Sequence, residues 1–159
     1  METKLELSIR PNWDELTAVQ TAVRGFLSTR GLAPDTVDAL EMVSSELVEN
    51  GLKYGTDNGE GDIELDVSVT PRAITVEVVN RLGNGPHDLQ RLDRTIQWIR
   101  GHQTPFEAYL RRIEEISRRD PKAAENGLGL VRIAYEGQAV LDFYVKPDDR
   151  LAVSAVYPL

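Results

Sequence analysis

Alternation between polar and apolar residues predicts the strands of this protein. Leu5, Leu7 and Ile9 are separated by single polar residues, and this two-residue period is typical of a strand with one buried face. The same period on both sides of a Thr70-Pro71-Arg72 turn predicts a β-hairpin. Two later runs predict a second antiparallel pair. The predicted strands cover residues 4–10, 63–69, 74–78, 140–145 and 151–157.

Apolar residues at intervals of three or four predict five helices. The second begins near Pro34, which suits the first turn of a helix, and it is long and mostly apolar, so we expect it to be central. The third and fourth are separated by Gly101 and Pro105 and are predicted to form a helical hairpin. The predicted helices cover about residues 13–30, 34–54, 89–99, 106–116 and 128–135.

The order of these elements predicts an α/β fold with two layers. Two helices separate the first strand from the hairpin, and three helices separate the two strand pairs. This order suits a two-layer sandwich of a mixed, mostly antiparallel sheet with helices on one face. A chain of 159 residues with 41% hydrophobic residues is enough for one compact domain. We therefore predict a single domain over 1–159, with the helical hairpin as an insertion over 84–125.

Composition and charge exclude several classes of function. A formal net charge of -8 argues against a dedicated nucleic-acid binder, which needs a basic face. The lack of cysteine excludes thiolate metal sites and a cysteine nucleophile, and the two histidines lie outside any metal-binding motif, so any metal is expected to have oxygen ligands. The sequence shows no signal peptide and no long apolar run, which predicts a cytoplasmic protein without membrane contact.

Three polar side chains of different chemistry are predicted to form a column on the second helix. Asn50 follows Glu46 by four residues and precedes Lys53 by three, so all three lie on one helix face. An amide oxygen is a suitable ligand for Mg²⁺, a carboxylate can orient or deprotonate a hydroxyl, and a lysine can contact a phosphate. The spacing alone leaves a second interpretation open, a solvated polar face with an ordinary side-chain pair.

Two glycine clusters flank the predicted insertion. They are Gly83-Asn84-Gly85 and Gly127-Leu128-Gly129, and the second opens a helix. A glycine-rich turn that leads into a helix presents backbone N–H groups and a positive dipole end, which can hold a phosphate. Neither cluster matches a Walker loop or a dinucleotide fingerprint, and an ordinary turn is the alternative for each.

The order of these motifs is more specific than any one of them. The segment Glu46-Leu-Val-Glu-Asn50-Gly-Leu-Lys53-Tyr54 precedes a hairpin, a Gly-x-Gly turn, a helical insertion and then Asn126-Gly-Leu-Gly-Leu-Val. In this order the chain resembles the GHKL superfamily of ATP-binding domains, which includes the histidine kinases and gyrase. Its small size is most similar to the anti-sigma-factor serine kinases that act on STAS-domain partners. The resemblance covers residues 1–159.

The resemblance implies a Mg-ATP site built from matching positions. Glu46 would act as general base or would orient the attacking hydroxyl, and Asn50 would coordinate the Mg²⁺ that bridges the nucleotide phosphates. Residues 84–125 would form a lid over ATP, and its closure would exclude water from the transfer. The other nucleotide-binding positions that the resemblance implies are Lys53, Asn80, Gly83, Gly85, Gly127 and Gly129.

The strand end before the first glycine cluster departs from the family pattern. Family members carry an aspartate there that accepts the adenine amino group, whereas this chain has Asn80 followed by Arg81. If Asn80 substitutes with one inserted residue, its side-chain oxygen still accepts from the amine, as a neutral and weaker partner. This departure motivates the alternative function, a catalytically silent scaffold of the same fold that binds and sequesters a protein partner.

The predicted lid is also longer and richer in arginine than the family pattern. Residues 88–119 contain seven arginines against five acidic residues. Their apolar stripes either pack within the domain or form a docking or dimerisation surface, and their arginines either bind phosphate or an acidic partner or form a solvated basic face. The resemblance implies an ATP-dependent serine/threonine kinase of a small regulatory protein, of STAS type or in a sigma-factor system, and is compatible with a homodimer.

Overall fold

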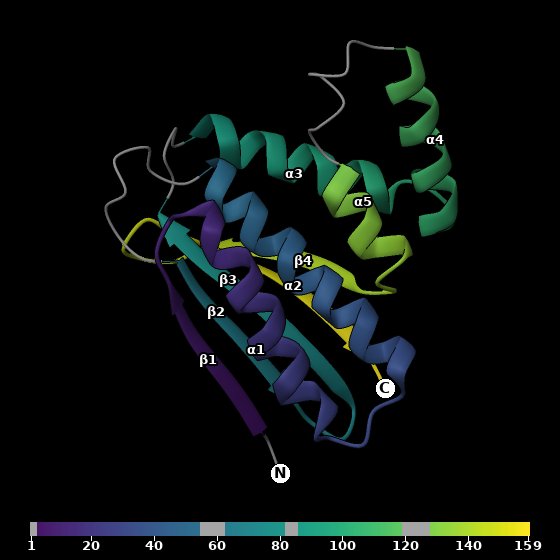
Figure 1. Ribbon diagram of the computed structural model, residues 1–159. Helices are drawn as coiled ribbons and strands as arrows, with labels where there is room; N and C mark the ends of the chain where they lie inside the picture. The colour runs from purple at the N-terminus through teal and green to yellow at the C-terminus, as the bar shows by residue number, and fades with distance from the viewer. Residues whose placement is uncertain (1–2, 55–62, 82–85, 119–127) are drawn as a thin grey trace.

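A five-stranded antiparallel sheet forms one layer of the computed structural model, which describes residues 3–54, 63–81, 86–118 and 128–159 (Figure 1). The strands lie in the order β1-β2-β3-β5-β4, and each neighbouring pair is antiparallel. The strands are β1 (Thr3–Ile9), β2 (Ile63–Val69), β3 (Ala73–Arg81), β4 (Val140–Val145) and β5 (Arg150–Pro158).

The helices form the second layer. In Figure 1, α1 and α2 run across one face of the sheet, while α3, α4 and α5 gather at one end of this layer. The first predicted helix begins as a 3₁₀ turn, Trp13–Glu15, in which the Asn12 side chain accepts a hydrogen bond from the Asp14 backbone N–H. The α-helices are α1 (Leu16–Ser28), α2 (Pro34–Tyr54), α3 (Pro86–Arg100), α4 (Pro105–Arg118) and α5 (Leu128–Tyr135).

The two-layer α/β prediction is confirmed, but the described sheet has no parallel pair where a mixed one was expected. The connections explain this. Two helices separate β1 from β2, and β2 then returns to the sheet beside β1 in the opposite direction. β2 joins β3, and β4 joins β5, through short turns that make adjacent strands antiparallel. On the opposite face of the sheet, Lys4 forms ion pairs with Glu6 and Asp66.

Helix α2 is the centre of the core, as its apolar pattern predicts. Leu40, Val43 and Leu47 follow one another at helical spacing and are almost fully buried. They belong to the same cluster as inward-facing side chains of the sheet, among them Leu65 and Val76. Burying each side chain of this size contributes about 1.5–3 kcal/mol relative to leaving it in water. This packing fixes the face of α2 that carries the polar column.

The two predicted apolar stripes of the insertion have different surroundings. On α3, Ile96 and Ile99 are buried in the core cluster. On α4, the Tyr109 ring lies 4.9 Å from that of Tyr135 on α5, but Leu110 and Ile113 remain exposed. The α3 stripe therefore packs within the fold, whereas part of the α4 stripe faces outward.

Candidate functional site

The polar column that the sequence predicts lies on α2, in the segment that faces α5. Glu46 and Asn50 are half-buried and Lys53 is exposed. The Glu46 side chain keeps 15% of its surface accessible. The hydrophobic face of α2 is fixed against the sheet, so these residues are held by a rigid helix rather than by a loop.

Arg132 on α5 holds the Glu46 carboxylate. Its Nη1 donates a hydrogen bond of 2.9 Å to Glu46 Oε1, and its Nε donates one of 2.8 Å to Glu136 Oε2. Arg132 could not be predicted from the sequence as a site residue, because it is 86 positions from Glu46 and only the fold brings the two together. The spacing of four between Arg132 and Glu136 is a local signal for that pair alone.

The environment of Glu46 makes its carboxylate a stronger base than an ordinary glutamate. Burial raises the pKa of Glu46 above its usual value of 4.5, and the negative charge of Glu49 adds to this rise. The positive charges of Arg132 and Lys53 act in the opposite direction. A carboxylate with a raised pKa, held in one orientation by a guanidinium, is suited to accept a proton from a hydroxyl.

Gly129 lies against the same carboxylate. It is in the first turn of α5, and a Cβ atom added there would collide with Glu46 Oε2 and lie 3.3 Å from Glu46 Cδ. The second glycine cluster therefore lets α5 approach α2 closely enough for Arg132 to reach Glu46. Gly127, in the same cluster, lies outside the described residues.

Asn80 is the buried polar side chain at the end of β3. It is 5% exposed, and its Nδ2 donates a hydrogen bond of 3.1 Å to the Arg81 carbonyl. Its Oδ1 lies on the α2 side, 3.6 Å from the place where a Cβ on Gly51 would sit. Arg81 is exposed and pairs across the sheet with Arg150. Of the two residues at this strand end, Asn80 is therefore the one that faces α2, the helix that carries Asn50. Gly83 and Gly85 of the first glycine cluster lie outside the described residues.

The donors around α2 fit a nucleotide-bound magnesium better than a metal bound by protein alone. Within the described ranges, no group of three or more histidine or acidic side chains could hold a metal ion. Asn50 offers one amide oxygen, and Mg²⁺ commonly combines one or two protein ligands with phosphate and water oxygens.

An open groove of about 300 Å³ adjoins Glu46 on the side away from the sheet. It lies between α1, α2 and α5, and acidic side chains dominate its lining. Besides Glu46, the residues that line it include Gln20, Asp38, Glu41, Ser45, Glu49 and Arg132.

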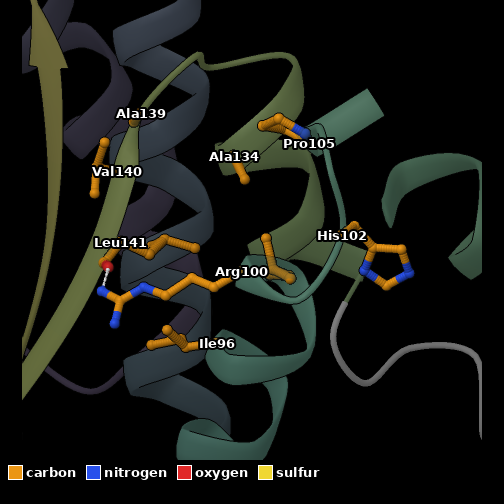
Figure 2. A pocket seen from close by; sticks show the side chains of 9 residues that line it. Ile96, Arg100, His102, Pro105, Ala134, Ala139, Val140 and Leu141 are labelled. Atoms are coloured by element: carbon orange, nitrogen blue, oxygen red, sulfur yellow. Dashed lines mark hydrogen bonds between the residues drawn. The ribbon is translucent and has the colours of Figure 1, made fainter. Parts of the chain in front are cut away.

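A second pocket, of about 250 Å³, is apolar and contains no residue of α2. Ile96, Ala134 and Leu141 line it, from α3, α5 and β4. Figure 2 shows Arg100 crossing its wall toward β4, where Nη2 donates a hydrogen bond of 2.6 Å to the Leu141 carbonyl. This bond gives a partner to a backbone carbonyl of β4, which is an edge strand of the sheet.

The fold and a match to a family model define the class of protein. The family model of the histidine kinase-like ATPase domain matches residues 9–135, and the chain belongs to this family, within the GHKL superfamily. The match includes the Glu46, Asn50 and Gly129 positions. None of the helices in the described ranges is long and apolar enough to cross a membrane.

A solved structure shares the fold over nearly the whole chain. It is a chain in the crystal structure of the SiaB–SiaC complex from Pseudomonas aeruginosa, with a TM-score of 0.66 and 18% sequence identity. The alignment covers 98% of this chain and 89% of that one. No curated protein shows significant sequence similarity to this chain.

Proposed function

We propose that this protein is an ATP-dependent serine/threonine kinase of a small regulatory protein in a bacterial partner-switching system. The observation that carries the proposal is the Glu46 carboxylate, half-buried, raised in pKa and fixed by Arg132 beside Asn50. Family membership supports the nucleotide, and the similar chain comes from a complex with a second protein. We place the protein in the cytoplasm, where such partners act.

Each residue of the column has a separate task in this proposal. Bound Mg-ATP would supply the γ-phosphoryl group, with Asn50 as a magnesium ligand and Lys53 near the phosphates. The glycine positions and Asn80 would bind the rest of the nucleotide under a lid formed by 84–125. Glu46 orients the acceptor hydroxyl and takes its proton as the oxygen bonds to phosphorus, while ADP leaves with the electrons of the broken bond. Arg132 keeps Glu46 in the orientation that this requires.

Two substitutions separate nucleotide binding from proton transfer. Asn50→Ala should weaken Mg-ATP binding in calorimetry and abolish transfer of labelled phosphate to a co-purified or candidate acceptor protein. Glu46→Gln keeps the size and the bond from Arg132, so it should leave Mg-ATP binding within about threefold and still reduce transfer by at least about a hundredfold. Asp142→Asn, on β4, is the control with unchanged binding and transfer. Wild-type transfer by both site variants would overturn the proposal.

A silent scaffold is the second candidate, because Asn80 offers a neutral acceptor where the family has a carboxylate, and Arg81 faces solvent beside it. In that case the chain would bind and sequester a protein partner without using nucleotide, and a homodimer is compatible with this function. Calorimetry distinguishes the two: no heat of binding at millimolar Mg-ATP would favour the scaffold. Binding that Asn80→Ala weakens would favour the kinase.

A further inference from the structure

The groove beside Glu46 has an excess of negative charge. Four carboxylates line it, those of Asp38, Glu41, Glu46 and Glu49, against the single guanidinium of Arg132. Arg24 on α1 donates hydrogen bonds of 2.6 Å to both Glu41 and Asp38, and so neutralises only part of one wall. Arg132 is shared between Glu46 and Glu136. Glu49 forms no ion pair with any described residue, although it is close enough to Glu46 to raise its pKa.

Ser45 gives the groove an unused hydrogen-bonding group. The residue lines the groove, is 7% exposed, and its Oγ is buried with no hydrogen-bond partner among the described residues. Its neighbour Ser44 shows the usual alternative, since the Ser44 hydroxyl donates to the Leu40 carbonyl one turn back. A buried hydroxyl without a partner costs free energy, and a groove ligand removes that cost once rotation about the Ser45 Cα–Cβ bond turns the hydroxyl toward it.

We propose that this groove binds a lysine or arginine side chain of the protein segment that carries the acceptor hydroxyl, with Glu49 and the Asp38–Glu41 wall as its acidic contacts. The inference rests on the proposed function, and it adds the chemistry of the acceptor segment. Glu46 is common to the groove and to the column, so a positive side chain in the groove lies close in space to the acceptor hydroxyl, and a short segment with an arginine or lysine beside its serine can supply both.

Other occupants fit the groove less well. Its negative charge repels phosphate, so the groove is not an extension of the nucleotide site. The described acidic side chains form no cluster that could hold a metal ion. An organic cation is the occupant that fits the groove best. The long aliphatic stem of lysine or arginine can lie along the Met42 side chain, which also lines the groove.

The test uses the full chain and two labelled synthetic peptides of equal length. One has the sequence Arg-Arg-Ala-Ser-Ala and the other Glu-Glu-Ala-Ser-Ala, and fluorescence anisotropy measures their binding without nucleotide. The basic peptide should bind at least about tenfold more tightly, and the difference should shrink as salt rises from about 50 to 300 mM. Glu49→Gln should weaken binding of the basic peptide about three- to tenfold, whereas Asp142→Asn, on β4, should not change it. Equal binding of the two peptides, or no effect of Glu49→Gln, would overturn the inference.

Ser45→Ala supplies a readout that a purely structural role would not give. Removing an unpartnered buried hydroxyl should leave the urea midpoint unchanged or raise it. The inference predicts that the same variant binds the basic peptide several-fold more weakly. Mg-ATP binding is also measured on the wild-type protein. Absence of Mg-ATP binding together with a preference for the basic peptide refutes the kinase, whereas Mg-ATP binding and transfer without a peptide preference refute only the basic acceptor segment.

Discussion

The substitution Gly129→Ala places a methyl group where the Glu46 carboxylate lies. The added Cβ would collide with Glu46 Oε2, so the carboxylate must move and its bond to Arg132 must lengthen or break. A charge-assisted hydrogen bond contributes about 1.5–3 kcal/mol, and the lower part of that range applies because the Arg132 side chain is 38% exposed. Alanine in a helix gains up to about 1 kcal/mol over glycine. We expect a net loss of about 0.5–2 kcal/mol.

A double-mutant comparison tests whether the collision with Glu46 causes this loss of stability. In a Glu46→Ala background the collision is absent, so Gly129→Ala should stabilise the protein by about 0.5–1 kcal/mol. Gly25→Ala in α1 is the matched control, since a Cβ there meets nothing within 4 Å, and it should stabilise in both backgrounds. Urea denaturation at equilibrium measures all five variants, with midpoint shifts of about 0.3–1 M. Stabilisation by Gly129→Ala in the wild-type background would refute the packing of α5 on Glu46.

Three further outcomes follow from other parts of the fold. Because the pKa of Glu46 is raised in the folded state, the native protein binds more protons than the unfolded chain above about pH 4.5, so its free energy of unfolding falls as pH rises through that window. The free energy of unfolding of Glu46→Gln should therefore rise relative to that of the wild type as the pH increases above about 4.5 in urea titrations, and a difference that does not change with pH would contradict this. Leu47→Ala in the core should lower the free energy of unfolding by about 2–5 kcal/mol. Val140→Ala, at an exposed position, should lower it by less than about 0.5 kcal/mol, and thermal and urea unfolding measure both variants. Arg112→Ala removes a guanidinium 4.4 Å from the Trp98 ring centre and should shift Trp98 emission to longer wavelength in a Trp13→Phe background; an unchanged spectrum would contradict the contact.

The sequence predicted the features that depend on local periodicity. The strand period over 63–69 and the helical pattern from Pro34 to Tyr54 match β2 and α2. The column of Glu46 and Asn50 could be placed on one helix face because its spacing is a property of the helix itself. Gly31 ends the first helical region with a φ of +72°, in the left-handed conformation that glycine favours there.

Features that depend on contacts between distant segments could not be predicted in the same way. Nothing in the spacing of Arg132 indicates that it bonds Glu46, because that contact requires α5 to cross α2 at the close distance that Gly129 permits. The partial exposure of the apolar stripe on α4 could not be predicted either, because a periodic apolar pattern does not show which surface covers it. The roles of Lys53, Asn80 and the glycine clusters in binding nucleotide stay predictions.

The strand order has a consequence for how the protein forms during synthesis. β5 is the last of the five strands along the chain, yet it lies between β3 and β4. Until β5 has been synthesised, β3 has an open edge and β4 has no partner in the sheet, so the nascent chain exposes unpaired strand edges from the synthesis of β3 to that of β5. Folding must then wait for pairs such as Val76 with Ala155, far apart in sequence. A chain stalled before β5 is therefore expected to need chaperone protection.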